Sequence, residues 1–311
     1  INNKNSNEET YYKQIKQALL YLESEVKKGR IHYYGISSNT FDTNQTNTNS
    51  TSLNKLLEIV KEIPNHHFKI IQCPFNLIEH SLAKRKNEIS FFELAHNHNL
   101  DLITNRPLNA MINNQLFKLV DVDENTEITD IEIDDLIQNG LEHEASLKTT
   151  LKDKEIPSIS PYITLFEKLN ETQSTTITYF TFKELLEDIF IPQIDHIMSL
   201  FEEFNLDSDI EHQFLNYFSL FNHIAKELSH YYKQIHQTKI IELKATLPNH
   251  ISNDIPIHTI ALQSYKNTPY ITATLIGITH EEHLESALSN LKHNSITSLS
   301  WNDLDINTVL T

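Results

Sequence analysis

Residues 27–40 read KKGRIHYYGISSNT, and this stretch decides the fold. The chain has four glycines among its 311 residues, and two of them, Gly29 and Gly35, lie here around a short apolar run. Gly29 follows an amphipathic helix predicted over 11–28, whose last turn ends in two lysines, so we expect a left-handed residue that ends the helix. Residues 30–37 are rich in aromatic and β-branched side chains, which predicts a strand.

The same alternation of helix and strand continues on both sides of a long middle region. Apolar periodicity and capping residues predict helices over 52–63, 90–99, 255–267 and 281–292, and strands over 68–75, 100–107 and 270–278. Near-continuous apolar runs are typical of strands that are buried on both faces. Alternation at this spacing indicates parallel βα units, and therefore an α/β fold.

The middle of the chain, residues 112–254, has a different pattern. It contains helical stripes such as Phe214, Phe218 and Phe221, which are most simply core positions between packed helices, and no convincing strand. We expect a helical insertion after the strand at 100–107. The polar segments 1–10 and 41–51 are expected to be irregular.

Composition limits the classes of partner. The net charge is −17, which repels phosphate backbones and anionic lipid headgroups, so neither nucleic acid nor membrane binding is expected. A single cysteine, Cys73, forbids an internal disulfide and favours a reducing, cytoplasmic location. The sequence begins with Ile1 rather than Met, so we expect that residues precede it.

Four segments in order resemble a known enzyme family. ALLYLESEVKKGRIHYYGISSNTF, IIQCPFNLIEH, LAHNHNLDLITNRPLNAM and LIGITHEEHLESALSNL are similar to the second half of an aldo/keto reductase, in a long variant with the NRPLNA motif and a helical insertion. The match covers about residues 10–111 and 255–292. It implies the last four strands of a (β/α)8 TIM barrel, with 1–111 and 255–311 as the barrel half and 112–254 as the insertion.

The resemblance also implies that NAD(P)H is the cofactor. Ser37 and Ser38, with Asn39 one step later, match the family's Ser-Asn pair at the nicotinamide carboxamide. Gln72 matches a glutamine that contacts the same carboxamide. Asn105 lies where many members place a tyrosine that stacks on the nicotinamide.

Further matching positions concern the phosphates. Arg106, followed by Pro107 and Leu108, is expected to engage the pyrophosphate bidentately. Gly277 matches a glycine before the helix whose N-terminus receives the adenosine phosphate. Thr279 and His283 lie where relatives often carry arginine.

Two functions follow from this resemblance. The preferred one is the cofactor-binding half of an NAD(P)H-dependent oxidoreductase that reduces a small carbonyl substrate; the family's catalytic Asp, Tyr, Lys and His are expected upstream of residue 1. The alternative is a noncatalytic scaffold whose insertion binds a protein partner. The preference between NADH and NADPH and the oligomeric state stay open.

Single features have simpler explanations that also stay open. Gly35 lies near the end of its strand, where a glycine lets a flat cofactor approach the backbone, which is the preferred explanation; the alternative is that it relieves local crowding. The two imidazoles of HNHN, at 96–99, are expected at a solvated helix end rather than at a metal. Cys73 is expected to be an inert buried thiol.

Overall fold

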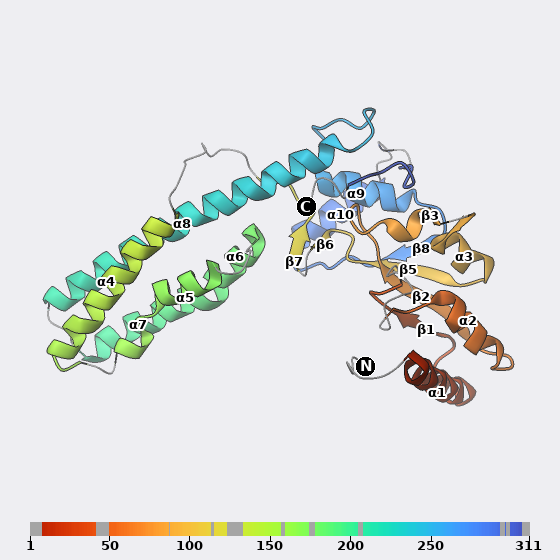
Figure 1. The fold of residues 1–311 in the computed structure, drawn as a ribbon, viewed down its shortest axis with the longest axis horizontal. Helices are drawn as coiled ribbons and strands as arrows, with labels where there is room; N and C mark the ends of the chain where they lie inside the picture. Colours follow the sequence, from red (N-terminus) through yellow and green to blue (C-terminus); the bar gives the residue numbers. More distant parts are fainter. Residues whose placement is uncertain are drawn as a thin grey trace. The chain divides into compact units, whose positions relative to one another are not determined.

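The computed structural model describes residues 8–41, 50–86, 88–112, 115–122, 133–156, 159–173, 178–204, 208–292, 296 and 299–306. The chain divides into two compact units (Figure 1): unit 1 is residues 1–111, 118–120 and 242–311, and unit 2 is residues 112–117 and 121–241. Over the described ranges, no helix combines the length and apolar character that crossing a membrane requires.

Unit 1 alternates helices and strands, as predicted, around a central four-stranded sheet, with β3 and β4 paired in a separate small sheet (Figure 1). Its helices are α1 (Glu8–Lys27), α2 (Leu53–Lys61), the 3-10 turn η1 (Ser81–Ala83), α3 (Phe91–Asn97), α9 (Ile257–Lys266) and α10 (Glu281–Lys292). Its strands are β1 (Tyr34–Ser37), β2 (Phe68–Pro74), β3 (Arg85–Lys86), β4 (Ile89–Ser90), β5 (Asp101–Asn105), β6 (Asn109–Ile112) and β8 (Ile271–Thr274).

The central sheet has four parallel strands in the order β1-β2-β5-β8. Strand order follows chain order, so each connection steps to the next strand in the same direction. A doubly wound sheet would instead reverse direction at a switch point. The structure therefore confirms a mixed α/β fold with a parallel sheet; closure into a barrel stays a prediction.

The two faces of this sheet differ in burial. Ile71 and Cys73 of β2 pair with Leu102 and Thr104 of β5, and all four side chains are fully buried. On the opposite face the side chains of Ile70, Gln72 and Ile103 are half-buried, and Ala273 is exposed. Because side chains alternate along a strand, the polar residues on this second face are the ones that a ligand can reach.

Local capping explains where several elements begin and end. The Gly29 N–H donates to the Val26 carbonyl and the Arg30 N–H to the Glu25 carbonyl, with Gly29 at φ +72°, which is the glycine-ended helix terminus that the sequence predicted. The Ser90 hydroxyl accepts from the Glu93 N–H at 3.1 Å, which confirms it as the cap of α3.

Gly35 is required by the neighbouring strand. A Cβ atom at this position would lie 2.0 Å from the carbonyl oxygen of Ile70, in a part of the β1–β2 pairing where the register shifts. The structure thus supports relief of crowding as the reason for this glycine, and the prediction of a cofactor approach at Gly35 has no support from its contacts.

Several strands are shorter than the sequence predicted. β8 ends at Thr274 rather than at 278, and β5 ends at Asn105 because Arg106 adopts φ +56° and turns the chain. The predicted irregular segments 1–10 and 41–51 fall largely outside the described residues, although α1 begins at Glu8 and Thr51 is buried.

Unit 2 is mainly helical (Figure 1). Its elements are β7 (Gln115–Lys118), α4 (Ile133–Asp153), the 3-10 turn η2 (Ser160–Tyr162), α5 (Leu165–Gln173), α6 (Tyr179–Leu185), the π-helical turn η3 (Leu186–Phe190), α7 (Ile191–Phe204) and α8 (Ser208–Ala245), the last of which continues beyond the unit. The expectation that 112–254 lacks strands was wrong at β7, whose four residues are too few to show a clear alternation.

The core of unit 2 joins all of its long helices. Phe214, Phe218 and Phe221 of α8 are buried in one apolar cluster with residues of α4, α5, α6 and α7, which confirms the stripe as core packing. Gly140 of α4 permits close approach of α5, because a Cβ there would lie 2.1 Å from the Phe166 ring.

Candidate functional site

Three of the predicted site residues share one region of the sheet. Ser37 at the end of β1 pairs with Gln72 of β2, and Gln72 pairs with Ile103 of β5. Asn105 lies two residues beyond Ile103 on the same strand and therefore on the same face. The parallel register thus brings Ser37, Gln72 and Asn105 to the half-exposed face near the carboxyl edge, where the ligands of parallel α/β sheets usually bind.

The two amides of this face differ in how they are satisfied. The Oδ1 atom of Asn105 is buried and has no hydrogen-bond partner. The Gln72 side chain on the same face is half-buried. Buried polar atoms in folded proteins are almost always hydrogen-bonded, so this amide oxygen calls for a donor from outside the chain, such as a water or a ligand.

Ser38 is occupied elsewhere. Its hydroxyl lies 2.7 Å from the Thr51 hydroxyl and 3.0 Å from the Thr40 hydroxyl, and the Thr51 hydroxyl also contacts the Tyr11 hydroxyl at 3.0 Å. This network ties the end of β1 to α1 and to the start of α2. Asn39, the next residue, is exposed. Ser38 is therefore a structural residue in this conformation.

Arg106 forms an ion pair within the rim of the sheet. Its Nη2 donates to Glu79 Oε1 at 2.7 Å, and its Nε is buried without a partner. The backbone at φ +56° is uncommon for a residue other than glycine. Since one edge of the guanidinium already binds a carboxylate, a bidentate contact to a pyrophosphate would have to displace Glu79 or use the other edge.

The loop after β2 contributes residues that the sequence analysis missed. Asn76 is fully buried: its Oδ1 accepts from the N–H groups of Ile78 and Glu79, and its Nδ2 donates to Glu79 Oε2 at 2.8 Å and to the Arg106 carbonyl at 3.2 Å. Glu79 Oε2 also accepts from the Met111 N–H. An asparagine shortly after a strand signals such a turn, but its partner across the rim is not visible in the sequence.

Tyr265 of α9 connects two loops at the same edge. Its hydroxyl accepts from the Leu77 N–H at 2.8 Å and donates to the Pro107 carbonyl at 2.9 Å. Burial raises the pKa of this phenol well above its ordinary value, so the hydroxyl stays protonated. Tyr265 is thus a fixed anchor for the loops that carry Glu79 and Arg106.

The remaining predicted positions lie after β8. Gly277 and Thr279 are exposed on the chain between β8 and α10, and nothing lies within 4 Å of a Cβ built on Gly277. The Thr279 hydroxyl lies 3.4 Å from His283 Nδ1. The first turn of α10 carries Glu281 and Glu282, which oppose a phosphate at this helix end.

Metal and thiol chemistry find no support in the described residues. No group of three or more His, Cys, Asp or Glu side chains there could hold a metal ion. His96 of the HNHN segment contacts the Tyr270 ring, with centroids 4.8 Å apart. Cys73 is buried, as predicted, and desolvation raises the pKa of its thiol to about 12, which disfavours the thiolate.

Comparison with known proteins gives no relative from which a function could be proposed, so the proposal below depends on the site geometry. The chain matches no protein-family model, no curated protein and no solved structure.

Proposed function

We propose that unit 1 binds the nicotinamide of NAD(P)H at the carboxyl edge of its parallel sheet, as the cofactor-binding part of an oxidoreductase that reduces a small carbonyl substrate. Under this proposal the four strands are the last four of an aldo/keto reductase-like (β/α)8 barrel. The proton donor is the tyrosine that the resemblance places on an earlier strand.

The orphaned Oδ1 of Asn105 is the observation that carries this proposal. A nicotinamide carboxamide offers two N–H donors and one carbonyl acceptor. Asn105 Oδ1 needs a donor, and the amide of Gln72 offers both a donor and an acceptor. A carboxamide is therefore a group that satisfies this face without leaving either side unpaired.

The surface around the amides suits a flat ring. Ile70 and Ile103 are half-buried on the same face as Gln72, and Ser37 lies at its end. Small-molecule sites combine such an apolar surface with a few convergent polar groups. When bound, NAD(P)H supplies a hydride to a carbonyl carbon; the role of Gln72 and Asn105 is to hold the carboxamide and so fix which face of the ring is presented.

The phosphate end of the cofactor receives less support from the geometry. Glu281 and Glu282 begin α10, and Arg106 is paired with Glu79. The proposal therefore assigns the nicotinamide, rather than the adenosine phosphate, to this set of residues.

The test uses reduced nicotinamide mononucleotide, which lacks the adenosine half. We expect saturation-transfer NMR to detect millimolar binding to the full chain, weakened by about tenfold or more in Asn105→Ala and in Gln72→Ala. Because Asn105 Oδ1 has no partner in the protein, Asn105→Ala should leave the melting temperature unchanged.

Asn139→Ala is the control, since Asn139 is an exposed amide on α4 of unit 2. Equal binding by the wild type and Asn105→Ala, or no binding by any of the proteins at about 10 mM nucleotide, would exclude the proposed site.

The scaffold alternative has one observation in its favour. Ile191 and Met198, seven residues apart on α7, are both exposed, and so is Ile189 just before this helix. Residues at this spacing lie on one helix face, and exposed apolar faces often contact other proteins. Under this alternative, Asn105→Ala and Gln72→Ala do not change nucleotide binding. The double variant Ile191→Ser, Met198→Ser abolishes association with the protein partner.

A further inference from the structure

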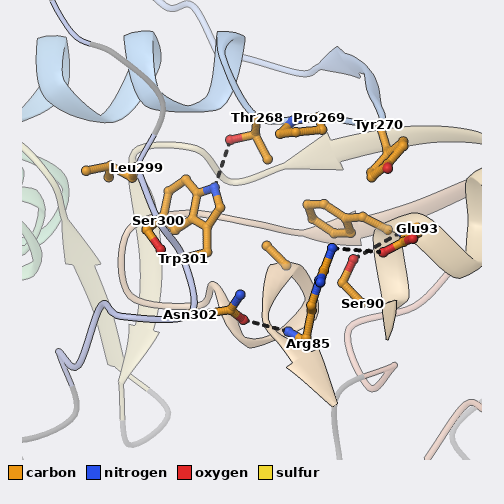
Figure 2. Close-up of a pocket in the computed structure, with 12 residues that line it drawn as sticks. Arg85, Ser90, Glu93, Thr268, Pro269, Tyr270, Leu299, Ser300, Trp301 and Asn302 are labelled. Carbon is orange, nitrogen blue, oxygen red and sulfur yellow. Dashed lines mark hydrogen bonds and ion pairs between the residues drawn. The ribbon is translucent and has the colours of Figure 1, made fainter. Parts of the chain in front are cut away.

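Unit 1 contains a cavity of about 270 Å³ that is separate from the carboxyl-edge residues (Figure 2). Its lining comes from the β3–β4 region and α3, from the segment that leads into β8, and from the C-terminal segment 299–302. None of the residues at the carboxyl edge discussed above lines it. Figure 2 shows Arg85, Ser90 and Glu93 on one side and Pro269 and Tyr270 on the opposite side, with Leu299 and Trp301 at one end.

Two opposite charges face this cavity without closing on each other. Arg85 Nη2 and Glu93 Oε2 are 3.9 Å apart, at the limit of an ion pair and beyond hydrogen-bond distance. The Arg85 side chain is 62% exposed and the Glu93 side chain 24%. Both groups therefore keep hydrogen-bonding capacity for a ligand that brings its own charges.

Backbone bonds hold these two residues in place, so that their side chains are free to bind. The Arg85 N–H donates to Asn302 Oδ1 at 2.8 Å, and the Glu93 N–H donates to the Ser90 hydroxyl oxygen at 3.1 Å (Figure 2). These two hydrogen bonds fix the backbone of Arg85 and Glu93 beside the cavity.

The rest of the cavity is largely apolar and aromatic. Trp301 and Phe92 line the cavity and are largely buried, and the Trp301 indole N–H is satisfied by the Thr268 hydroxyl at 3.1 Å, so the indole brings no unsatisfied donor to the cavity. Leu299 is also buried, and Tyr270 is 42% exposed at the opposite side. These surfaces suit an apolar group of a few carbon atoms.

We propose that this cavity binds a small zwitterion with an apolar side chain, that is, a free α-amino acid such as leucine. Its carboxylate binds Arg85, its ammonium binds Glu93, and its side chain lies against Trp301 and Phe92. The two charges of an α-amino acid are separated by one carbon, which matches the short spacing of Arg85 and Glu93. A simple anion would face Glu93 and a simple cation would face Arg85, and a volume of about 270 Å³ is too small for a dinucleotide.

Trp301 makes the test direct, because it is the only tryptophan of the chain. We expect L-leucine to change the Trp301 emission in a saturable way. 4-Methylpentanoate lacks the ammonium group and 3-methylbutylamine lacks the carboxylate, so each should bind at least about tenfold more weakly.

Arg85→Gln and Glu93→Gln keep the backbone bonds to Asn302 and Ser90 and should each weaken L-leucine binding by about tenfold or more. Lys183→Gln is the matched control, since Lys183 and Glu187 form a 3.7 Å exposed pair in unit 2. Isothermal titration calorimetry provides a second measurement that does not depend on emission.

Three results would overturn the proposal: no binding by either method up to about 20 mM, equal affinity for leucine and its singly charged analogues, or unchanged affinity in both charge variants. The outcome is separate from that of the nicotinamide site, because Asn105→Ala should leave L-leucine binding unchanged. Failure of one site therefore leaves the other tested on its own.

Discussion

Among single residues, Glu144 of α4 is a carboxylate that is almost completely buried in unit 2. Its side chain is 1% exposed, and its Oε2 accepts from the Tyr217 hydroxyl at 2.7 Å and from the Phe166 N–H at 2.8 Å. Lys148 Nζ lies 3.3 Å from Oε1. Glu144 of α4 thereby binds the first turn of α5 to α8, a long-range helix cap.

This environment makes a prediction about pH. Burial raises the pKa of Glu144, an effect that the bonds from Tyr217 and Phe166 partly offset. The native state then holds a proton that the unfolded state has released, so this contribution to stability is full below the unfolded pKa and is lost as pH rises through the folded pKa. We expect the wild type to lose stability relative to Glu144→Gln as pH rises from about 4 to 7, measured by denaturant unfolding.

Two further variants identify the cause. Glu167→Gln removes a carboxylate that is half exposed and contacts the same Lys148; because its charge is the smallest cause of the raised pKa of Glu144, it should reproduce only a small part of the pH effect. Glu144→Ala leaves two buried donors without an acceptor and should cost about 3 kcal/mol at low pH, and less as pH rises and the wild type loses its own Glu144 contribution. A pH-independent difference between the wild type and Glu144→Gln would contradict the assigned direction.

For the elements, the pairing of β1 with β2 depends on Gly35. Gly35→Ala places a methyl group 2.0 Å from the Ile70 carbonyl oxygen, so the two backbones must move apart. We expect a loss of about 2 kcal/mol in the free energy of unfolding, within the range of overpacked core positions. Gly277→Ala is the control, because no atom lies within 4 Å of its Cβ, and thermal unfolding should stay within about 0.5 kcal/mol of the wild type. Equal effects of the two substitutions would show that β1 does not approach β2 this closely.

Elements of unit 1 were largely predictable because their signals are local. Gly29 and Ser90 act through hydrogen bonds to residues at most five positions away, and the alternation of helix and strand requires only the apolar pattern. The ends of β5 and β8 were less predictable. Arg106 ends β5 because its φ is positive, and a positive φ is not expected from the sequence at an arginine.

For the whole molecule, the two units have separate cores. Phe214 is fully buried in the cluster of unit 2, and Leu56 is fully buried in unit 1. Phe214→Ala should lower the midpoint temperature of helix unfolding, followed by far-UV circular dichroism, by roughly 10 °C. The Trp301 emission transition reports on unit 1 and should move by less than about 2 °C in this variant.

Leu56→Ala should have the reverse effect, with the larger shift in the Trp301 transition. Should both signals move together in both variants, the chain would unfold as one cooperative unit and the division into two cores would have no thermodynamic meaning.

The sequence by itself determined the parallel βα order of unit 1, the helical character of unit 2 and the positions of the amides at strand ends, because periodicity and capping act over a few residues. Only the tertiary structure decided which polar groups remain available. Ser38 and Arg106 are bound by Thr51 and Glu79, while Asn105 Oδ1 is left without a partner. The anchor Tyr265 acts across 188 residues, and Trp301 reaches Thr268 across 33, and such contacts depend on the packing of distant segments rather than on any local pattern.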